Sequence, residues 1–478
     1  MAPSEPVETE ITTLTFRLFG NDSARACVRM PRRLVVLALM TIALSASACR
    51  TTYSERVSRA HGFASAGNYP GAIREMNRVL GVDSVNELPD KWTAHKPLAT
   101  LERAVLLQAT DDFARSSRDL SGADMQLEYL DLELDTPGNL GKYVYSDSAQ
   151  IYKATPTEKL ALNAFNMLNY LALGELSGAA VEARRFGVIR DYLVERDRNA
   201  RGAFGSYLAG FVFEHLGETD RALRHYNDAL ADVDDIGSLG QAIVDLSNAS
   251  TYRGEPLARY LETEAARRYA EQPVEDESAE ILVVTSVGRV PYKEPATMPI
   301  GLAIGYAGAF ITGDLRVLER TAFKVVRYPE LHPSPSDLDR VRVHVDGTDV
   351  PAPLITNLGD EIVREHEELK PMLIGSALTR MIARALAAEG ARQAGRQASY
   401  GFGLLAALAT EAALVGLDKP DTRSWTFLPE RIRIARRRVP PGEHRVVVSL
   451  DGSASEQREV TFDLPPRTFG VLVVTAPR

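Results

Sequence analysis

The spacing of hydrophobic residues changes twice along the chain. A short apolar run, Leu34–Leu44, comes first. From Tyr53 to about Gln272, apolar residues recur every three or four positions, which predicts amphipathic helices. Beyond an acidic, proline-containing break at Glu271–Ala279, short β-branched runs such as Glu280–Val287 are separated by turn residues, which predicts strands. We therefore expect a helical domain at 49–272 and a β-rich domain at 273–478.

A spacing of five residues from glycine to alanine recurs three times in the helical part, at Gly67/Ala72, Gly174/Ala179 and Gly217/Ala222. The glycine suits a tight turn between two antiparallel helices, and the alanine lets the second helix pack closely. These stretches resemble tetratricopeptide repeats, helix pairs that stack into a solenoid. The anchor alanines are 107 and 43 residues apart, so we expect an irregular array, with a plain helical bundle as the alternative. The other expected packing residues are Phe63, Tyr170, Gly210, Phe213, Tyr226 and Ala229.

The C-terminal half reads as an antiparallel sheet or sandwich, because its strands are short and separated by turns. A helical insertion is expected at 362–417, where Leu378, Ile382 and Leu386 fall on one stripe of a helix. The stretch Tyr400–Leu417 is strongly apolar but contains Glu411, which favours a packed helix over a membrane span. The expected fold class is therefore α+β: a TPR-like α-helical solenoid followed by an antiparallel β-rich domain with a helical insertion.

The N-terminus has the pattern of a signal peptide. A basic start at Met30–Arg33, the apolar run and the small residues Ser45–Ala48 follow in order. The apolar run is shorter than the roughly 20 residues that span a bilayer. Ala46–Cys49 resembles a lipobox, which implies cleavage between Ala48 and Cys49 and lipidation of Cys49. Ala46 replaces the usual leucine, so cleavage within Ser45–Ala48 by ordinary signal peptidase is the alternative. Residues 1–29 lack periodicity, and we expect a dispensable extension or a start at Met30 rather than Met1, leaving 30–48 as the signal peptide.

Composition narrows the classes of function. The net charge is −9, which argues against nucleic acid as a partner, since phosphate binding needs clustered Lys and Arg. The two cysteines are Cys27 and Cys49, so the exported body has no disulfide and no thiol nucleophile. No catalytic motif stands out, and we expect no cofactor and no metal. The acidic residues around His366, from Glu361 to Glu368, could bind a cation, but a solvated helical face explains them more simply.

Three C-terminal stretches carry a resemblance: Gly288–Glu294, Asp418–Ile432 with its Asp421-Thr-Arg423-Ser-Trp425 core, and Val439–His444. With the signal peptide and the helical half in the same order, the chain is similar to an uncharacterised family of Gram-negative tetratricopeptide lipoproteins. The resemblance implies an exported lipoprotein at the outer membrane facing the periplasm, with surface exposure left open, and no catalytic residue to transfer. The genes that neighbour those of such proteins suggest a role in cell-wall assembly. Asp421, Arg423 and Trp425 are candidates for partner binding; the alternative is that Trp425 anchors the edge of the sheet.

Our leading functional hypothesis is a lipid-anchored scaffold that binds a protein partner through the concave face of the repeats. The first alternative is an accessory regulator of peptidoglycan or envelope assembly, with cell-wall synthesis machinery as the partner. The second is an envelope hydrolase whose site is assembled from distant residues.

Overall fold

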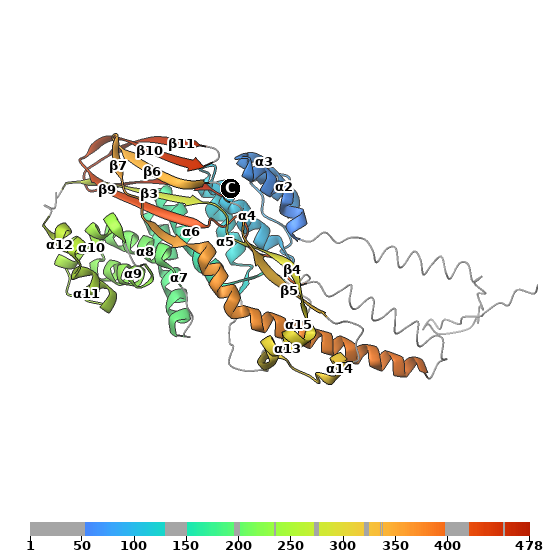
Figure 1. Cartoon of the computed structure of the whole chain (residues 1–478). Helices are drawn as coiled ribbons and strands as arrows, with labels where there is room; N and C mark the ends of the chain where they lie inside the picture. Colours follow the sequence, from blue (N-terminus) through green and yellow to red (C-terminus); the bar gives the residue numbers. More distant parts are fainter. Residues whose placement is uncertain are drawn as a thin grey trace, which may run out of the picture. The chain divides into compact units, whose positions relative to one another are not determined.

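A computed structural model describes most of the chain after residue 52 (Figure 1). The described residues are 53–129, 151–195, 201–233, 236–271, 277–319, 325–334, 336, 338–396, 420–452 and 455–478. The expected signal peptide, Cys49 and the apolar stretch at 400–417 lie outside them. Tyr53–Arg478 forms one compact unit. Within the described part, no helix has the length and apolar character needed to cross a bilayer.

The first half of this unit consists of helical hairpins. The pairs are α2 (Tyr53–Ser65) with α3 (Tyr69–Leu80), α4 (Lys96–Gln108) with α5 (Phe113–Asp124), α6 (Pro156–Ala172) with α7 (Leu176–Glu195), and α8 (Ala203–His215) with α9 (Thr219–Asp232). Three shorter helices follow: α10 (Gly240–Asn248), α11 (Glu255–Leu261) and α12 (Glu264–Ala270). Two-residue strands, β1 (Glu128–Tyr129) and β2 (Lys153–Ala154), pair in parallel between α5 and α6.

The turns inside the hairpins share one geometry. Gly67, Gly174 and Gly217 have φ values of 71°, 74° and 74°, in the left-handed region that glycine enters without strain. The next backbone N–H donates to the carbonyl five residues earlier, as in Glu218 to Phe213 at 2.9 Å, which is the capping pattern of a Schellman turn. The recurring glycine therefore ends the first helix of each pair.

The α4–α5 hairpin has the same turn but a different sequence. Asp111 takes the glycine position with φ 61°, and Asp112 N–H donates to the Leu107 carbonyl at 3.0 Å. Five residues after Asp111, the buried Ser116 stands where the other hairpins have alanine, and its hydroxyl donates to the Ala104 carbonyl. Sequence analysis missed this hairpin because both marker residues are replaced by polar ones of suitable size and conformation.

The expected packing residues lie mostly where helices touch. Ala72, Ala179, Ala222, Phe213, Tyr226 and Ala229 are buried. A Cβ at Gly210 would lie 2.5 Å from the ring of Tyr226, so only glycine allows this contact. The half-buried Tyr170 packs in the same way against Gly178. Phe63 is 37% exposed, but its ring packs across the α2–α3 hairpin, where a Cβ at Gly71 would lie 2.7 Å from it.

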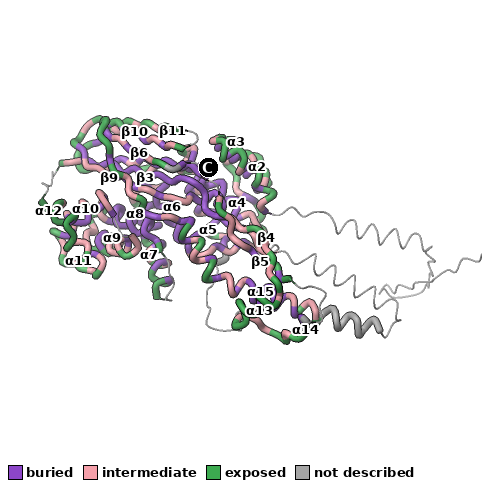
Figure 2. Tube along the Cα trace, in the orientation of Figure 1, coloured by how far each residue is buried: buried purple, intermediate pink, exposed green. Residues whose placement is uncertain are grey.

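The strands form two four-stranded sheets that lie face to face (Figure 1). One has the order β12 (Phe469–Ala476), β3 (Ala279–Val287), β9 (Arg431–Val439), β8 (Leu354–Asn357). The other has the order β11 (Glu456–Leu464), β10 (Gly442–Gly452), β6 (Leu338–Val345), β7 (Thr348–Val350). β12 pairs in parallel with β3, so the expectation of a wholly antiparallel sheet is wrong for this pair. β3 is buried along its whole length because both of its faces are covered, as is usual for a parallel pair (Figure 2).

The sheet β12-β3-β9-β8 joins the helical part of the chain to the rest of the β-rich part, because each of its faces packs on one of them. One face meets the second sheet through residues such as Ile281, Val283 and Val448. The other face packs on the helices, and Leu282 and Ile434 belong to the same hydrophobic core as α4, α6 and α8. Helices therefore give way to strands between Ala270 and Ala279, close to the expected boundary, but both parts share one core.

A long helix, α15 (Leu358–Arg396), extends from this body together with a hairpin of β4 (Tyr292–Pro299) and β5 (Val325–His332). Between these strands lie α13 (Ile300–Ala307), η4 (Gly308–Phe310) and α14 (Arg316–Glu319), and they pack on α15 through a third hydrophobic cluster. Leu378 and Ile382 are buried there as the stripe predicts, but Leu386 is 52% exposed. The helical insertion therefore begins near the expected residue, and its part beyond Arg396 lies outside the described residues.

Candidate functional site

A cavity of about 110 Å³ lies where four distant segments meet. The segments are the entrance to α6, the middle of α15, the start of β4, and the stretch 420–425 before β9. Its lining includes Tyr152, Glu158, Lys293, His366, Ser376, Asp421, Arg423, Ser424 and Trp425. The Gly288–Glu294 and Asp421–Trp425 motifs and the cluster around His366 therefore converge on one place.

Two buried carboxylates of the helical half hold the 420–427 stretch. Glu102 of α4 accepts hydrogen bonds from the backbone N–H groups of Thr426 (2.9 Å) and Phe427 (2.6 Å) and from the Thr426 hydroxyl (2.7 Å). Glu158 of α6 accepts the backbone N–H of Trp425 at 3.0 Å. The helices thus bind a segment of their own chain by its main-chain donors.

Asp421, Arg423 and Trp425 are largely engaged inside the molecule. Trp425 has no exposed surface, and the Arg423 guanidinium is bound by the Asp421 carboxylate, with Nη2 to Oδ2 at 2.7 Å. Arg423 also donates to the Ala94 carbonyl at 3.1 Å and lies over the ring of Tyr152. Trp425 and Arg423 are buried, so any contact of these residues with a partner would be made through the cavity that they line. The tryptophan is anchored on helices rather than at the edge of a sheet.

The carboxylates around the cavity are already hydrogen-bonded. Glu158 accepts from the Tyr152 hydroxyl at 2.6 Å and from Thr155 N–H at 3.0 Å, which forms a capping box at the start of α6. Glu365 accepts the Thr157 N–H at 3.2 Å. Burial raises the pKa of Glu365 to about 7, and hydrogen bonds from Thr155 and Thr157 offset part of that rise. Near neutral pH this group therefore holds a proton part of the time.

The cluster around His366 is not a solvated helical face, as sequence analysis expected. His366 and Glu361 are buried, and only Glu367 and Glu368 face solvent. Burial, together with the positive charge of Lys293, lowers the pKa of His366 to about 4, so its ring is neutral at pH 7.

Several polar atoms of the lining residues lack a hydrogen-bond partner. Within the described part of the chain, these are Nε2 of His366, Oγ of Ser376, Oγ of Ser424 and Nε1 of Trp425. Buried polar atoms in native proteins are nearly always paired, so several orphans around one cavity are unusual. Lys293 makes no ion pair with any described residue. The residues that line the cavity therefore carry four hydrogen-bonding atoms with no partner in the described part of the chain.

A second cavity, of about 260 Å³, adjoins the first and shares Lys293 and Ser424 with it. Its lining adds Tyr53, whose hydroxyl has no partner among the described residues. The other walls are polar, from His61, Arg289, Tyr292 and Ser334. The two cavities lie on either side of the 422–426 stretch, and we refer to them together as the pocket.

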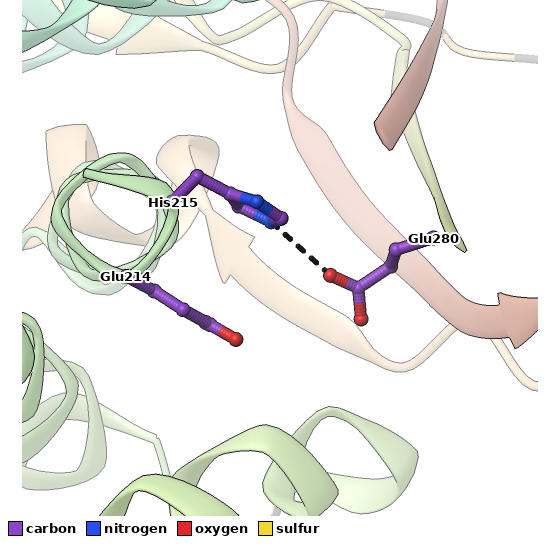
Figure 3. Close-up of side chains that lie close together, drawn as sticks. All are labelled: Glu214, His215 and Glu280. Atoms are coloured by element: carbon purple, nitrogen blue, oxygen red, sulfur yellow. Dashed lines mark hydrogen bonds and ion pairs between the residues drawn. The ribbon is translucent and has the colours of Figure 1, made fainter. Parts of the chain in front are cut away.

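A second cluster of titratable groups joins Glu214 and His215 of α8 to Glu280 of β3 (Figure 3). Their ligand-type atoms lie within 4.8 Å of one another, but the guanidinium of Arg436 is bound between the two carboxylates, at 2.7 Å from each. Burial would raise the pKa of Glu280, but Arg436 outweighs it and holds that pKa at about 2. A fixed positive charge at the centre opposes cation binding, so this cluster is a buried ion-pair network that ties helices to sheet.

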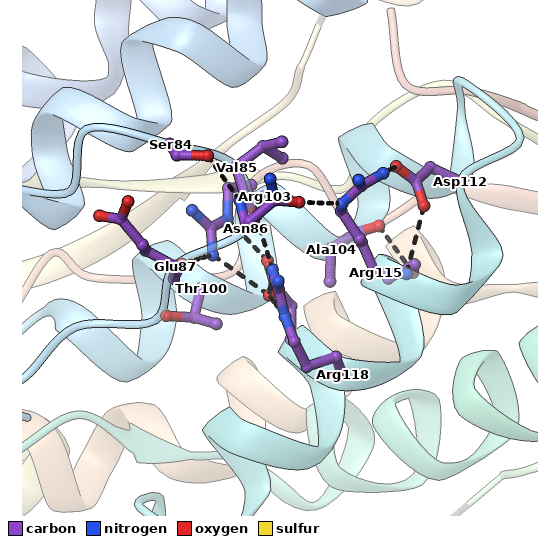
Figure 4. Close-up of polar contacts among 12 residues, drawn as sticks. Ser84, Val85, Asn86, Glu87, Thr100, Arg103, Ala104, Asp112, Arg115 and Arg118 are labelled. Atoms are coloured by element: carbon purple, nitrogen blue, oxygen red, sulfur yellow. Dashed lines mark hydrogen bonds and ion pairs between the residues drawn. The ribbon is translucent and has the colours of Figure 1, made fainter.

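A similar network joins the first two hairpins (Figure 4). Arg103 of α4 is fully buried and binds both oxygens of Asp119 in α5, at 2.6 and 3.1 Å. The same guanidinium donates to Asn77 of α3 and to the Glu87 carbonyl, both at 2.8 Å. Every bond is made to this chain, which indicates a structural role.

Sequence analysis named part of the pocket and missed the rest. Lys293 lies in the Gly288–Glu294 motif that carries the resemblance. Ser376 was not singled out, because a serine in an amphipathic helix carries no signal of its own.

No protein-family model matches the chain, and none of the curated proteins matches it significantly. Among solved structures, a crystal structure of MamA matches with a TM-score of 0.28 and 15% identity, covering 44% of this chain and 94% of that one. A likeness at this level supports no conclusion about fold or function.

Proposed function

We propose that this protein is a lipid-anchored protein of the cell envelope that binds a partner without catalysing a reaction, and that the partner engages the pocket. The observation that carries the proposal is the set of unpaired polar atoms around a cavity where the distinctive motifs converge. A cavity lined by apolar walls and a few convergent polar groups is the usual form of a binding site.

The binding place differs from the one that the sequence favoured. In a repeat solenoid, the first helices of the hairpins line a concave groove. A partner can bind in that groove only if solvent reaches it. Here α4, α6 and α8 are buried on all sides, because second helices cover one face and the chain's own sheet covers the other. A partner of these first helices would have to displace the sheet, whereas a partner of the pocket would not.

The proposal is tested by chemical crosslinking in intact envelopes followed by capture of the protein. Ser376→Leu places an isobutyl group into the cavity, and Val363→Leu is the matched control on an exposed part of the same helix. We expect the wild type and Val363→Leu to yield the same crosslinked partner, and Ser376→Leu to lose it while keeping its melting temperature. Equal capture by all three proteins would refute the pocket as the binding place. A partner from the cell-wall synthesis machinery would support the narrower role in envelope assembly.

The anchor is tested separately. Cys49→Ser removes the thiol that would carry the lipid, and we expect the protein to leave the membrane fraction. Unchanged sedimentation with the outer membrane would show that Cys49 is not the anchor. The hydrolase alternative predicts instead that purified protein cleaves muropeptides and that one acidic substitution abolishes the cleavage.

A further inference from the structure

The size of the first cavity limits what it can hold. A buried cavity of roughly 150 Å³ accommodates a benzene molecule. The cavity of about 110 Å³ therefore has room for one group the size of a leucine side chain. Its walls include Val290, Leu369 and Leu373, which suit an apolar group.

The hydrogen-bonding atoms without a partner include one that can only donate and two hydroxyls that can donate or accept. The indole Nε1 of Trp425 can only donate, and the hydroxyls of Ser376 and Ser424 can each donate a proton. The acceptors of the lining, by contrast, are already in use. Glu158 takes three hydrogen bonds, and Asp421 takes the Arg423 guanidinium. A ligand that satisfies this site must bring acceptor atoms.

The charged residues of the pocket also favour a ligand with acceptor atoms. Lys293 lines both cavities and forms no ion pair with a described residue. The carboxylates of the lining bind other groups: Glu158 and Glu365 accept hydrogen bonds from Tyr152 and Thr157, and Asp421 binds Arg423. A group with one negative charge beside Lys293 would complete the pairing.

We infer that the pocket binds an aliphatic group that ends in a carboxylate. The aliphatic part fills the cavity between β4 and α15, and the carboxylate lies at Lys293 and Ser424. Two sources share this chemistry: the C-terminal residue of a partner protein and a free short fatty acid. The inference rests on the proposed function, because it names the group through which the partner engages the pocket.

Trp425 provides a direct reporter of binding. The chain has two tryptophans, Trp92 and Trp425, so Trp92→Phe leaves emission from the pocket alone. Purified protein of this background is titrated with hexanoate, hexanamide, N-acetyl-leucine and N-acetyl-leucinamide. We expect both carboxylates to change the emission of Trp425 and to bind about 10- to 100-fold more tightly than the matching amides, the range for a hydrogen bond to a charged group. Tighter binding of N-acetyl-leucine would identify a peptide C-terminus as the source, and tighter binding of hexanoate a fatty acid.

Lys293→Met should remove the preference for carboxylates and leave binding of the amides unchanged. Lys91→Met is the control, because Lys91 is exposed and does not line the pocket. Lys293→Gln serves if the methionine variant fails to fold. The inference is overturned if amides bind as tightly as acids, if Lys293 variants keep the preference, or if no probe changes the emission at millimolar concentration. None of these results would remove a partner crosslinked in envelopes, so the inference can fail while the proposed function stands.

Discussion

Glu102 offers a quantitative test of how the C-terminal segment is docked on the helices. Its carboxylate is fully buried, makes no ion pair with a described residue, and accepts three hydrogen bonds from Thr426 and Phe427. Burial raises the pKa of Glu102 from 4.5 to about 8, and the three hydrogen bonds offset part of that rise. The folded protein therefore holds a proton on this group more tightly than the unfolded chain does.

The sign and size of the effect follow from this difference. Between the two pKa values, the unfolded state loses its proton and the folded state keeps it, so stability falls as the pH rises from about 4.5 to 8. Between pH 5 and pH 8 the loss from this group is about 3 to 4 kcal/mol in the free energy of unfolding. Glutamine has nearly the same shape, can still accept hydrogen bonds, and does not titrate.

The assay is urea denaturation of the wild type and Glu102→Gln at pH 5 and at pH 8. Other titrating groups, such as Glu365, contribute equally to both proteins, so the difference between them isolates Glu102. We expect the variant to gain about 3 to 4 kcal/mol relative to the wild type as the pH rises. The exposed Glu175→Gln is the control and should show no such gain. If the free energies of unfolding of Glu102→Gln and the wild type changed with pH in the same way, Glu102 would not be a buried carboxylate without an ion pair.

Four further substitutions test packing and ion pairing, each by chemical denaturation. Gly210→Ala should lose about 1 to 3 kcal/mol, because the added Cβ meets an aromatic ring at 2.5 Å. Gly301→Ala in α13, where nothing lies within 4 Å, should instead gain up to about 1 kcal/mol, and equal effects at the two glycines would contradict the packing. Asp119→Ala should cost about 3 to 5 kcal/mol, since it leaves Arg103 buried without its carboxylate; a loss below 1 kcal/mol would show that the pair is solvated. Arg436→Met should cost a similar amount by stranding the two carboxylates of Figure 3, and a neutral outcome would show that these are protonated or hydrated.

Local features of the sequence were sufficient to predict most of the elements. The glycine-to-alanine spacing marks three hairpins because a left-handed turn and a close helix contact each need a small residue. The α4–α5 hairpin escaped because Asp111 and Ser116 meet the same geometric demands with other chemistry. Alternating β-branched runs predicted strands, but the parallel pairing of β12 with β3 joins the two ends of the C-terminal half, and no local pattern specifies it.

The candidate site was predictable as a set of motifs but not as a pocket. The Asp421–Trp425 stretch is distinctive in sequence, yet its burial depends on Glu102 and Glu158, which lie far away in the chain. One warning was present in the sequence: α8 is apolar on every side, which indicates a helix covered all round rather than one lining an open groove. Read in this way, the composition of α8 would have argued against a concave binding face.

The central claim is that the partner engages the pocket rather than the surface of the helical repeats. A photoreactive amino acid can be placed at Leu373, which lines the pocket, and at Val188, which is 70% exposed on α7. Irradiation of intact cells should give a discrete adduct from position 373 and none from position 188. An adduct from position 188 with none from position 373 would place the partner on the repeats and contradict the account.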